Sequence, residues 1–162
     1  QLASALGAKE IALDLIQYRQ EQAKAFGADY SLFANKISIE DIRQINNGRL
    51  ADHVILCTGN MSAVSDTFKY VDKKGKILFF AVPPTSISLP STDLWRNEIS
   101  LFFSYGAAPD DIKKTIDLYK RKKINFKDMI THRFPLSRIM EGFLLVEEAN
   151  ESIKIVVTPD QD

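Results

Sequence analysis

At two positions in the sequence, side chains that could bind a ligand lie at or just after the end of an apolar run. Asp14 lies near the end of the run Ile11–Leu15. In sheets that bind nucleotides, a carboxylate at the end of a strand accepts hydrogen bonds from ribose hydroxyls. The alternative is an aspartate that caps a helix at a strand–helix turn. We expect the ligand-binding role for Asp14.

Thr58 and Gly59 follow a second apolar run, His53–Cys57. Parallel α/β sheets bind ligands at the carboxyl edge of their strands. There a threonine hydroxyl can bond to a ligand, and a glycine permits close approach of the backbone. Tight-turn geometry explains Gly59 equally well. We interpret Cys57 as a small core hydrophobe, because no nearby base would make it a nucleophile.

The chain contains few residues of the types that most often bind transition metals. His53 and His132 are the only histidines, and Cys57 is the only cysteine. Their separation matches no metal-binding spacing. We therefore expect two structural histidines, and we assign neither a catalytic residue nor a metal ligand to this chain.

The elements that must position these residues alternate between apolar runs and helical patterns. This alternation predicts a parallel sheet with crossover helices. Three runs are almost continuously apolar, as expected for strands covered on both faces: His53–Cys57, Ile77–Ala81 and Ile99–Phe103. Shorter strands are expected at Ile11–Leu15 and Tyr30–Phe33. The predicted fold class is α/β with a doubly wound sheet.

Capping residues suggest where helices begin. Ser38 and Asp41 resemble a capping box. Ser62 is expected to cap a helix that buries Val71 and closes near Gly75.

The last part of the chain has a separate pattern. It predicts a strand at Ile130–Phe134, a helix capped by Ser137 and a final strand at Ile153–Thr158. Periodicity leaves open whether this tail extends the sheet or leaves it for a second domain.

Composition argues against two kinds of partner. Twenty-one basic side chains balance twenty-one acidic ones, so no net field favours nucleic acid or an anionic membrane. No run approaches the roughly 20 apolar residues that span a bilayer. The single cysteine fits a reducing compartment, and we expect a cytoplasmic location. Because Gln1 already lies in a helical pattern, we expect the chain to begin inside a longer gene product.

Six segments occur in the order and at roughly the spacing of one family. They are Ala5–Lys9, Ile11–Asp14, Ala23–Asp29, Ala51–Asn60, Ser104–Gly106 and Ile130–Leu136. Together they resemble the cofactor half of the zinc-dependent medium-chain alcohol dehydrogenases, the class that includes sorbitol and threonine dehydrogenases. The resemblance implies a Rossmann-like sheet, NAD as cofactor, and a parent enzyme that uses zinc to oxidise a small secondary alcohol or polyol.

Parts of the family pattern are missing from this sequence. In the family, a central first strand and a Gly-rich turn that approaches the pyrophosphate precede the helix that opens here. The catalytic zinc ligands also lie in a substrate domain N-terminal to this region. The resemblance therefore implies a partial NAD-binding domain at residues 1–126 and a segment at 127–162 that returns to the substrate domain. It also implies that the chain alone is inactive.

The resemblance suggests three contacts at the adenosine end of NAD. Asp14 would accept hydrogen bonds from the ribose and repel the 2′-phosphate of NADP. Arg19 lies where relatives place a basic residue beside the adenosine, and it could pair with Asp14 or lie along the ribose. Lys154 matches a basic position that reaches the pyrophosphate in some relatives. A solvated helix charge and an exposed strand lysine are the alternatives for Arg19 and Lys154.

At the nicotinamide end, the resemblance adds Val82 and Ser104 to Thr58 and Gly59. Both would border the nicotinamide ring, and packing at a strand end is the alternative for each. We expect the parent enzyme to act on a small alcohol or polyol and to form a homo-oligomer through the cofactor domain.

Other functions remain open. A zinc-independent quinone or enoyl reductase favours NADPH and usually has a small or basic residue where Asp14 stands. A non-catalytic module for nucleotide binding or oligomerisation fits a chain without a Gly-rich turn. A methyltransferase shares the acidic residue after the second strand, but the ordered segments favour the dehydrogenase.

Overall fold

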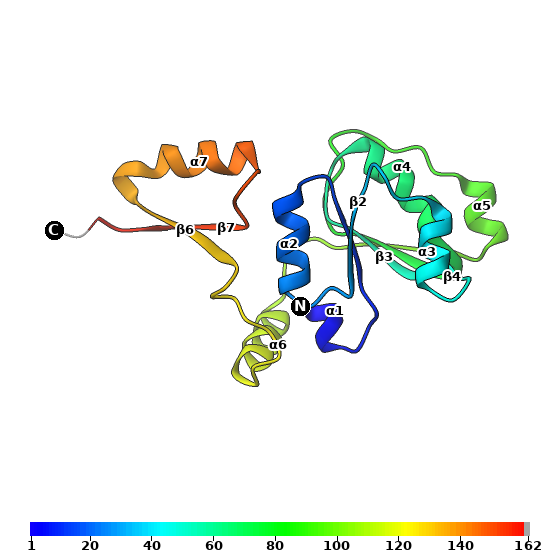
Figure 1. Ribbon diagram of the computed structural model, residues 1–162, viewed down its shortest axis with the longest axis horizontal. Coiled ribbons are helices and arrows are strands. Elements are labelled where there is room, and N and C mark those ends of the chain that lie inside the picture. Colours follow the sequence, from blue (N-terminus) through cyan, green and yellow to red (C-terminus); the bar gives the residue numbers. More distant parts are fainter. Residues whose placement is uncertain (161–162) are drawn as a thin grey trace. The chain divides into compact units, whose positions relative to one another are not determined.

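The computed structural model describes residues 1–160 and has an α/β architecture in which every strand pair of these residues is parallel (Figure 1). The chain divides into two compact units. One contains residues 37–107, and the other contains residues 1–36 together with the chain from Ala108 onward. The predicted α/β fold class is confirmed.

The unit of residues 37–107 is built on a three-stranded sheet with the order β3-β4-β5. Its strands are β3 (Ala51–Leu56), β4 (Val71–Phe79) and β5 (Ser100–Phe103). Its helices are α3 (Ile39–Ile45), α4 (Met61–Tyr70) and α5 (Ser91–Arg96). The core joins α4 to the sheet and consists of Leu56, Val64, Val71, Ile77 and Phe79. Helix α5 was not predicted from the sequence.

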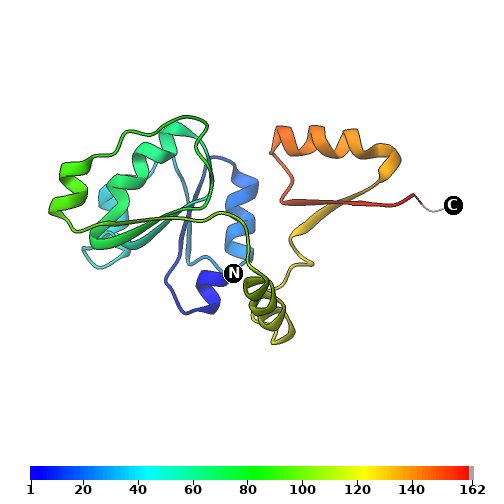
Figure 2. The ribbon, with the colours of Figure 1, turned by 180° about the vertical axis from the view of Figure 1, so that it is seen from behind.

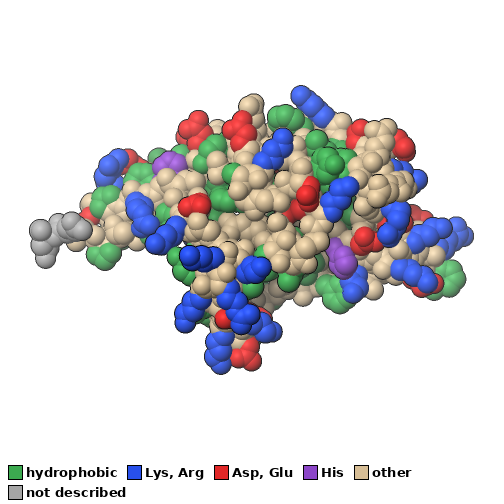
Figure 3. Space-filling model, turned by 60° about the horizontal axis from the view of Figure 1, so that its bottom comes forward, with side chains coloured by type: hydrophobic (Ala, Val, Ile, Leu, Met, Phe, Trp, Pro, Cys, Tyr) green, Lys and Arg blue, Asp and Glu red, His purple; other side chains and the backbone are tan. Residues whose placement is uncertain are grey.

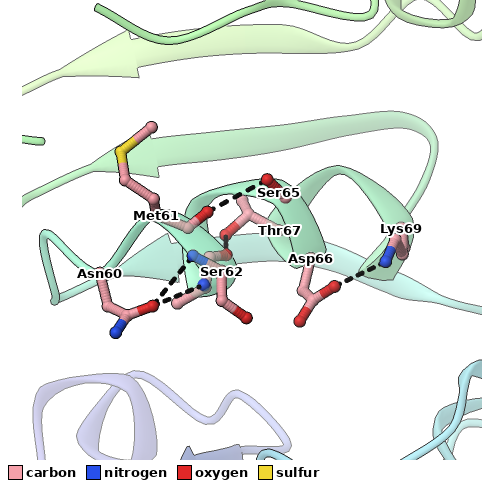
Figure 4. A network of polar contacts seen from close by, with 8 residues as sticks. Asn60, Met61, Ser62, Ser65, Asp66, Thr67 and Lys69 are labelled. Atoms are coloured by element: carbon pink, nitrogen blue, oxygen red, sulfur yellow. Dashed lines mark hydrogen bonds and ion pairs between the residues drawn. The ribbon is translucent and has the colours of Figure 1, made fainter. Parts of the chain in front are cut away.

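Helix α4 begins two residues earlier than predicted. Asn60, in an extended conformation, is the capping residue, and its Oδ1 accepts hydrogen bonds from the backbone N–H groups of Ser62 (2.9 Å) and Ala63 (3.4 Å) (Figure 4). The prediction that Ser62 caps this helix is therefore wrong. The amide oxygen of Asn60 satisfies N–H groups that have no partner inside the helix.

The other end of α4 also differs from the prediction. Val71 is the first residue of β4, where it pairs with Ala51, and it does not belong to the helix. Gly75 lies within β4 near a register shift and does not close the helix. A Cβ atom at Gly75 would lie 2.5 Å from Val71 Cγ2 and 2.7 Å from the Asp72 carbonyl oxygen. Close backbone approach therefore explains this glycine.

The second unit contains two separate pairs of strands. β1 (Ile11–Asp14) pairs with β2 (Tyr30–Phe33), and β6 (Ile130–Pro135) pairs with β7 (Lys154–Thr158). The helices of this unit are α1 (Leu2–Ala5), α2 (Gln17–Ala25), α6 (Pro109–Lys120), the 3₁₀ helix η1 (Leu136–Arg138) and α7 (Ile139–Glu148). Within residues 1–160, β1 pairs only with β2, and β6 pairs only with β7.

In the C-terminal tail, α7 connects the parallel strands β6 and β7 and packs on them (Figures 1 and 2). The tail thus forms a sheet of its own. The prediction that Ser137 caps α7 is wrong, because Ser137 lies inside η1. Its hydroxyl instead donates to Asp160 Oδ1 at 2.8 Å. Arg138 occupies the capping position without a side-chain capping bond.

Candidate functional site

Asp14 lies at the carboxyl end of β1 and is held there by three hydrogen bonds. Its Oδ1 accepts from the Ile16 N–H at 3.0 Å. Its carbonyl oxygen accepts from the Ala34 N–H at 3.0 Å and from Gln20 Nε2 at 3.0 Å. No other polar contact of this half-buried residue is found within residues 1–160, so Oδ2 has no partner there.

The turn at Asp14 follows directly from the local sequence. Ile16 precedes α2 with an extended backbone (φ −105°, ψ 122°), so the strand changes to a helix within two residues. A short aspartate side chain can bond the N–H two residues later, which stabilises such a turn. The capping alternative for Asp14 therefore accounts for one carboxylate oxygen and leaves the second free for a ligand.

Gln20 is a contact of Asp14 that the sequence analysis missed. Its side chain is buried, which is unusual for glutamine, and its amide bonds the Asp14 carbonyl oxygen. The sequence feature that could have indicated this contact was the position of Gln20, one helical turn after Ile16. Periodicity alone does not tell whether such a polar residue faces solvent or a turn.

Arg19 does not pair with Asp14 within the described chain, although that pairing was one of its two predicted roles. Its Nε donates to the Ala149 carbonyl oxygen at 3.1 Å. Ala149 follows α7 and has a left-handed backbone with φ 55°. A guanidinium at this point satisfies a free carbonyl and complements the negative end of the helix dipole.

Lys154 begins β7, on a different sheet from Asp14. Its side chain is exposed, and its carbonyl oxygen accepts a hydrogen bond from Thr131 Oγ1 at 3.3 Å. No contact joins Lys154 to Asp14 or Arg19 in the part of the chain that the structure describes.

In the other unit, four candidate residues follow the three parallel strands at the same edge of the sheet. Thr58 and Gly59 follow β3, Val82 follows β4, and Ser104 follows β5. A Cβ atom at Gly59 would lie 3.0 Å from the Val82 carbonyl oxygen, so these two residues are in close contact. Thr58 Oγ1 accepts from the Asn60 N–H at 3.2 Å. The Ser104 N–H donates to the Phe79 carbonyl oxygen at 3.3 Å.

Large apolar side chains are exposed at this edge. Val82 is 78% exposed, Phe103 is 71% exposed and Tyr105 is fully exposed. Phe103 nevertheless stacks on Phe79, with ring centroids 5.1 Å apart. Hydrophobic side chains also reach the surface among interspersed charged ones on the face seen in Figure 3. Exposed apolar groups around polar strand ends are typical of a surface that a ligand or another domain covers.

Cys57 is exposed at the end of β3, so the prediction that it belongs to the core is wrong. Partial desolvation by neighbouring atoms raises the pKa of its thiol. A raised pKa disfavours the thiolate at neutral pH, and only the thiolate is a good nucleophile.

His132 contacts other residues of the tail. Its Nδ1 lies 3.0 Å from Thr131 Oγ1, and its ring stacks on Phe134. Among residues 1–160, no three His, Cys, Asp or Glu side chains are grouped so that they could hold a metal ion. No helix in these residues is long and apolar enough to cross a bilayer.

Known proteins resemble the chain over most of its length. A sorbitol dehydrogenase of Halalkalibacterium halodurans is 27% identical over 147 residues, which cover 88% of this chain and 42% of the relative. Alcohol dehydrogenase 2 of Oryza sativa subsp. japonica is 30% identical over 163 residues, with 93% of this chain and 41% of the relative covered. The chain thus spans less than half the length of these relatives.

Solved structures show the same fold. A short chain alcohol dehydrogenase from E. coli, solved in complex with the cofactor NADH, superposes with a TM-score of 0.85 at 19% identity, covering 97% of this chain and 47% of the other. Residues 1–121 match the family described as zinc-binding dehydrogenase. This match covers well over half of the sequence, and the fold agrees with it. The chain belongs to the zinc-binding dehydrogenase family.

Proposed function

We propose that this chain holds NAD for a dehydrogenase that oxidises a small secondary alcohol or polyol, with the catalytic zinc ion bound by residues outside the chain. Membership of the zinc-binding dehydrogenase family supports the oxidoreductase class. The names of the relatives, sorbitol dehydrogenase and alcohol dehydrogenase, support the substrate class. The observation on which the choice of cofactor rests is the geometry of Asp14.

One oxygen of the Asp14 carboxylate is used by the turn, and the other has no partner within residues 1–160. Two neighbouring ribose hydroxyls are donors that match a carboxylate oxygen at the end of a strand. A 2′-phosphate at the same place would bring two negative charges together. The residues present therefore fit the adenosine ribose of NAD better than that of NADP.

Thr58, Gly59, Val82 and Ser104 are proposed to hold the nicotinamide end. Support comes from their common position at the carboxyl edge of β3, β4 and β5 and from the exposed apolar side chains beside them. When bound, NAD accepts a hydride from the alcohol. The residues of this chain would orient the ring and exclude water from its surroundings.

Within residues 1–160, no three His, Cys, Asp or Glu side chains lie close enough together to bind a zinc ion. We therefore assign this chain the work of binding and orienting the cofactor, and we expect the isolated chain to be inactive. Residues 1–126 would form a partial NAD-binding domain, and residues 127–162 would return to the substrate domain. The separate sheet of β6 and β7 supports a tail with a different partner.

Arg19 and Lys154 complete the proposed cofactor contacts. Arg19 uses Nε to bond Ala149, and its two terminal nitrogens have no partner within residues 1–160, so they remain available to the adenosine. The exposed Lys154 side chain would meet the pyrophosphate. We further propose a homo-oligomer, supported by the exposed apolar side chains, and a cytoplasmic location, supported by the single cysteine.

Isothermal titration with NAD and, separately, NADP tests the proposal. We expect NAD to bind more tightly than NADP, and we expect Asp14→Ala to remove this preference. Asp14→Asn is the matched control for the turn, because an amide oxygen still accepts from the Ile16 N–H while the charge is lost. It should keep the fold and lose the discrimination against NADP.

Other outcomes favour the other readings of the sequence. A preference for NADP in the unmodified protein would favour a zinc-independent reductase. Absence of binding to either nucleotide would favour a non-catalytic module and overturn the proposal.

A further inference from the structure

Gln20 lies in the first turns of α2 and is only 8% exposed. Burial of a primary amide is unfavourable unless its polar atoms find partners. The Nε2 of Gln20 donates to the Asp14 carbonyl oxygen at 3.0 Å, across the turn between β1 and α2. This side chain therefore contacts the same residue that is proposed to bind the ribose.

The Asp14 carbonyl does not need Gln20 to be satisfied. It also accepts from the Ala34 N–H at 3.0 Å, which continues the pairing of β1 with β2. The bond from Gln20 is thus a second bond to an acceptor that already has a partner. Its effect is to connect α2 to the end of β1.

The helix geometry explains how Gln20 reaches this point. Its own N–H bonds the Ile16 carbonyl oxygen at 3.2 Å, so Gln20 lies one turn after the start of α2. Side chains on a helix lean toward its N-terminus. Gln20 therefore extends back to the Asp14 carbonyl oxygen, while the Ile16 N–H bonds the Asp14 carboxylate.

We propose that Gln20 is a positioning residue that fixes the Asp14 turn and thereby sets the preference for NAD over NADP. The inference rests on the proposed function, because it requires Asp14 to bind the ribose. With Gln20 in place, α2 is connected to the end of β1, so the turn that carries the Asp14 carboxylate has a defined position. Without Gln20, this connection is lost and the turn can move together with Asp14 and Ile16, which weakens the bond of the carboxylate to the ribose and its repulsion of a 2′-phosphate.

The test compares the 162-residue chain with its variant Gln20→Met. Methionine matches the length and approximate volume of glutamine but donates no hydrogen bond. We expect the affinity for NAD to fall on the order of fivefold, as for the loss of one hydrogen bond. The affinity for NADP should stay constant or rise, so the ratio of the two dissociation constants changes. Thermal unfolding is measured in parallel.

Gln17→Met is the matched control on the same helix. Among the residues that the structure describes, the exposed Gln17 side chain bonds Glu21 alone, four residues along α2. This substitution should leave both affinities and their ratio unchanged. A second variant, Gln20→Asn, keeps the amide but is one methylene shorter, so it should lose the preference as Gln20→Met does.

An unchanged ratio of NAD to NADP affinity in either folded Gln20 variant would overturn the inference, even if both affinities fell together. Loss of the fold in both variants would also overturn it, because Gln20 would then be a structural residue. The variant Asp14→Ala separates the two hypotheses. If it removes the preference and the Gln20 variants do not, only the inference fails. If Asp14→Ala keeps the preference, the proposed function fails.

Discussion

At the scale of single residues, Asp14 combines a structural task with the proposed binding task. Its Oδ1 and its carbonyl oxygen accept three hydrogen bonds from Ile16, Ala34 and Gln20, while Oδ2 has no partner in the described residues. A carboxylate that is already held loses little freedom when a ligand binds, and this lowers the entropic cost of binding. Because the turn uses Oδ1 and leaves Oδ2 without a partner, the capping role of Asp14 is compatible with its proposed role in ligand binding.

Gly59 leads to a prediction at the same scale. A Cβ atom there would lie 3.0 Å from the Val82 carbonyl oxygen and 3.5 Å from Pro84 Cδ. Since backbone and a proline ring yield little, Gly59→Ala should lower the free energy of unfolding by about 1–3 kcal/mol. Urea unfolding measures this loss. A variant as stable as the parent would show that the loop after β4 moves freely, and that the close approach is not required.

At the scale of elements, caps and crossovers position the candidate residues. The capping box of α3 is present as predicted: Ser38 Oγ accepts from the Asp41 N–H, and the Asp41 carboxylate accepts from the Ser38 N–H. The hydroxyl and the backbone N–H of Ser38 both donate to the Asp41 carboxylate, and these two bonds stabilise its charged form and lower the pKa of Asp41. Ser38 is exposed and Asp41 is partly exposed, so solvent screens part of this contribution.

The lowered pKa of Asp41 predicts a pH dependence. A carboxyl group whose folded pKa is lower than its unfolded value of 3.8 binds fewer protons in the folded state. Its stabilising effect is therefore complete above the unfolded pKa and is lost as the pH falls through the folded pKa. The stability difference between the parent and Ser38→Ala should shrink as urea unfolding is repeated at decreasing pH. A difference that grew toward acid pH would contradict this assignment.

Gly142 gives a prediction of opposite sign to that at Gly59. It lies in the middle of α7 and packs against β6 and β7, where an added Cβ would be 3.4 Å from Phe134 Cδ2 and 3.5 Å from Ile155 Cγ2. These are ordinary contact distances. Because alanine is the better helix former, Gly142→Ala should raise the free energy of unfolding by about 0.5–1 kcal/mol. Clear destabilisation in the same urea assay would mean that α7 is packed more tightly on its sheet.

At the scale of the whole chain, strand edges and apolar surface remain without partners. Within residues 1–160, β1 pairs only with β2, and β3 pairs only with β4. Several large apolar side chains are exposed as well, among them Leu6, Trp95 and Met140. Unpaired edges are templates for association.

We therefore expect the 162-residue chain to self-associate and to turn over no alcohol with NAD. Sedimentation velocity over a concentration series should show a sedimentation coefficient that rises with concentration, and NADH absorbance should stay flat with any alcohol. A monomer at all concentrations would contradict the first expectation. Measurable turnover would contradict the second and would require a catalytic group within this chain.

The sequence alone was sufficient to predict the fold class and most strands. Near-continuous apolar runs located β3, β4 and β5, and the pair Ser38 and Asp41 located the start of α3. Such signals are local, because periodicity and capping act over a few residues. The order of the six family segments likewise needed no structure.

Tertiary structure alone decided which residues contact one another. It showed that Val71 begins a strand, that Gly75 and Gly59 lie against backbone, and that Cys57 is exposed. It also showed that Arg19 bonds the distant Ala149 and that the buried Gln20 holds Asp14. These contacts depend on packing between elements, and the direction in which a polar side chain turns is set by partners that periodicity does not specify.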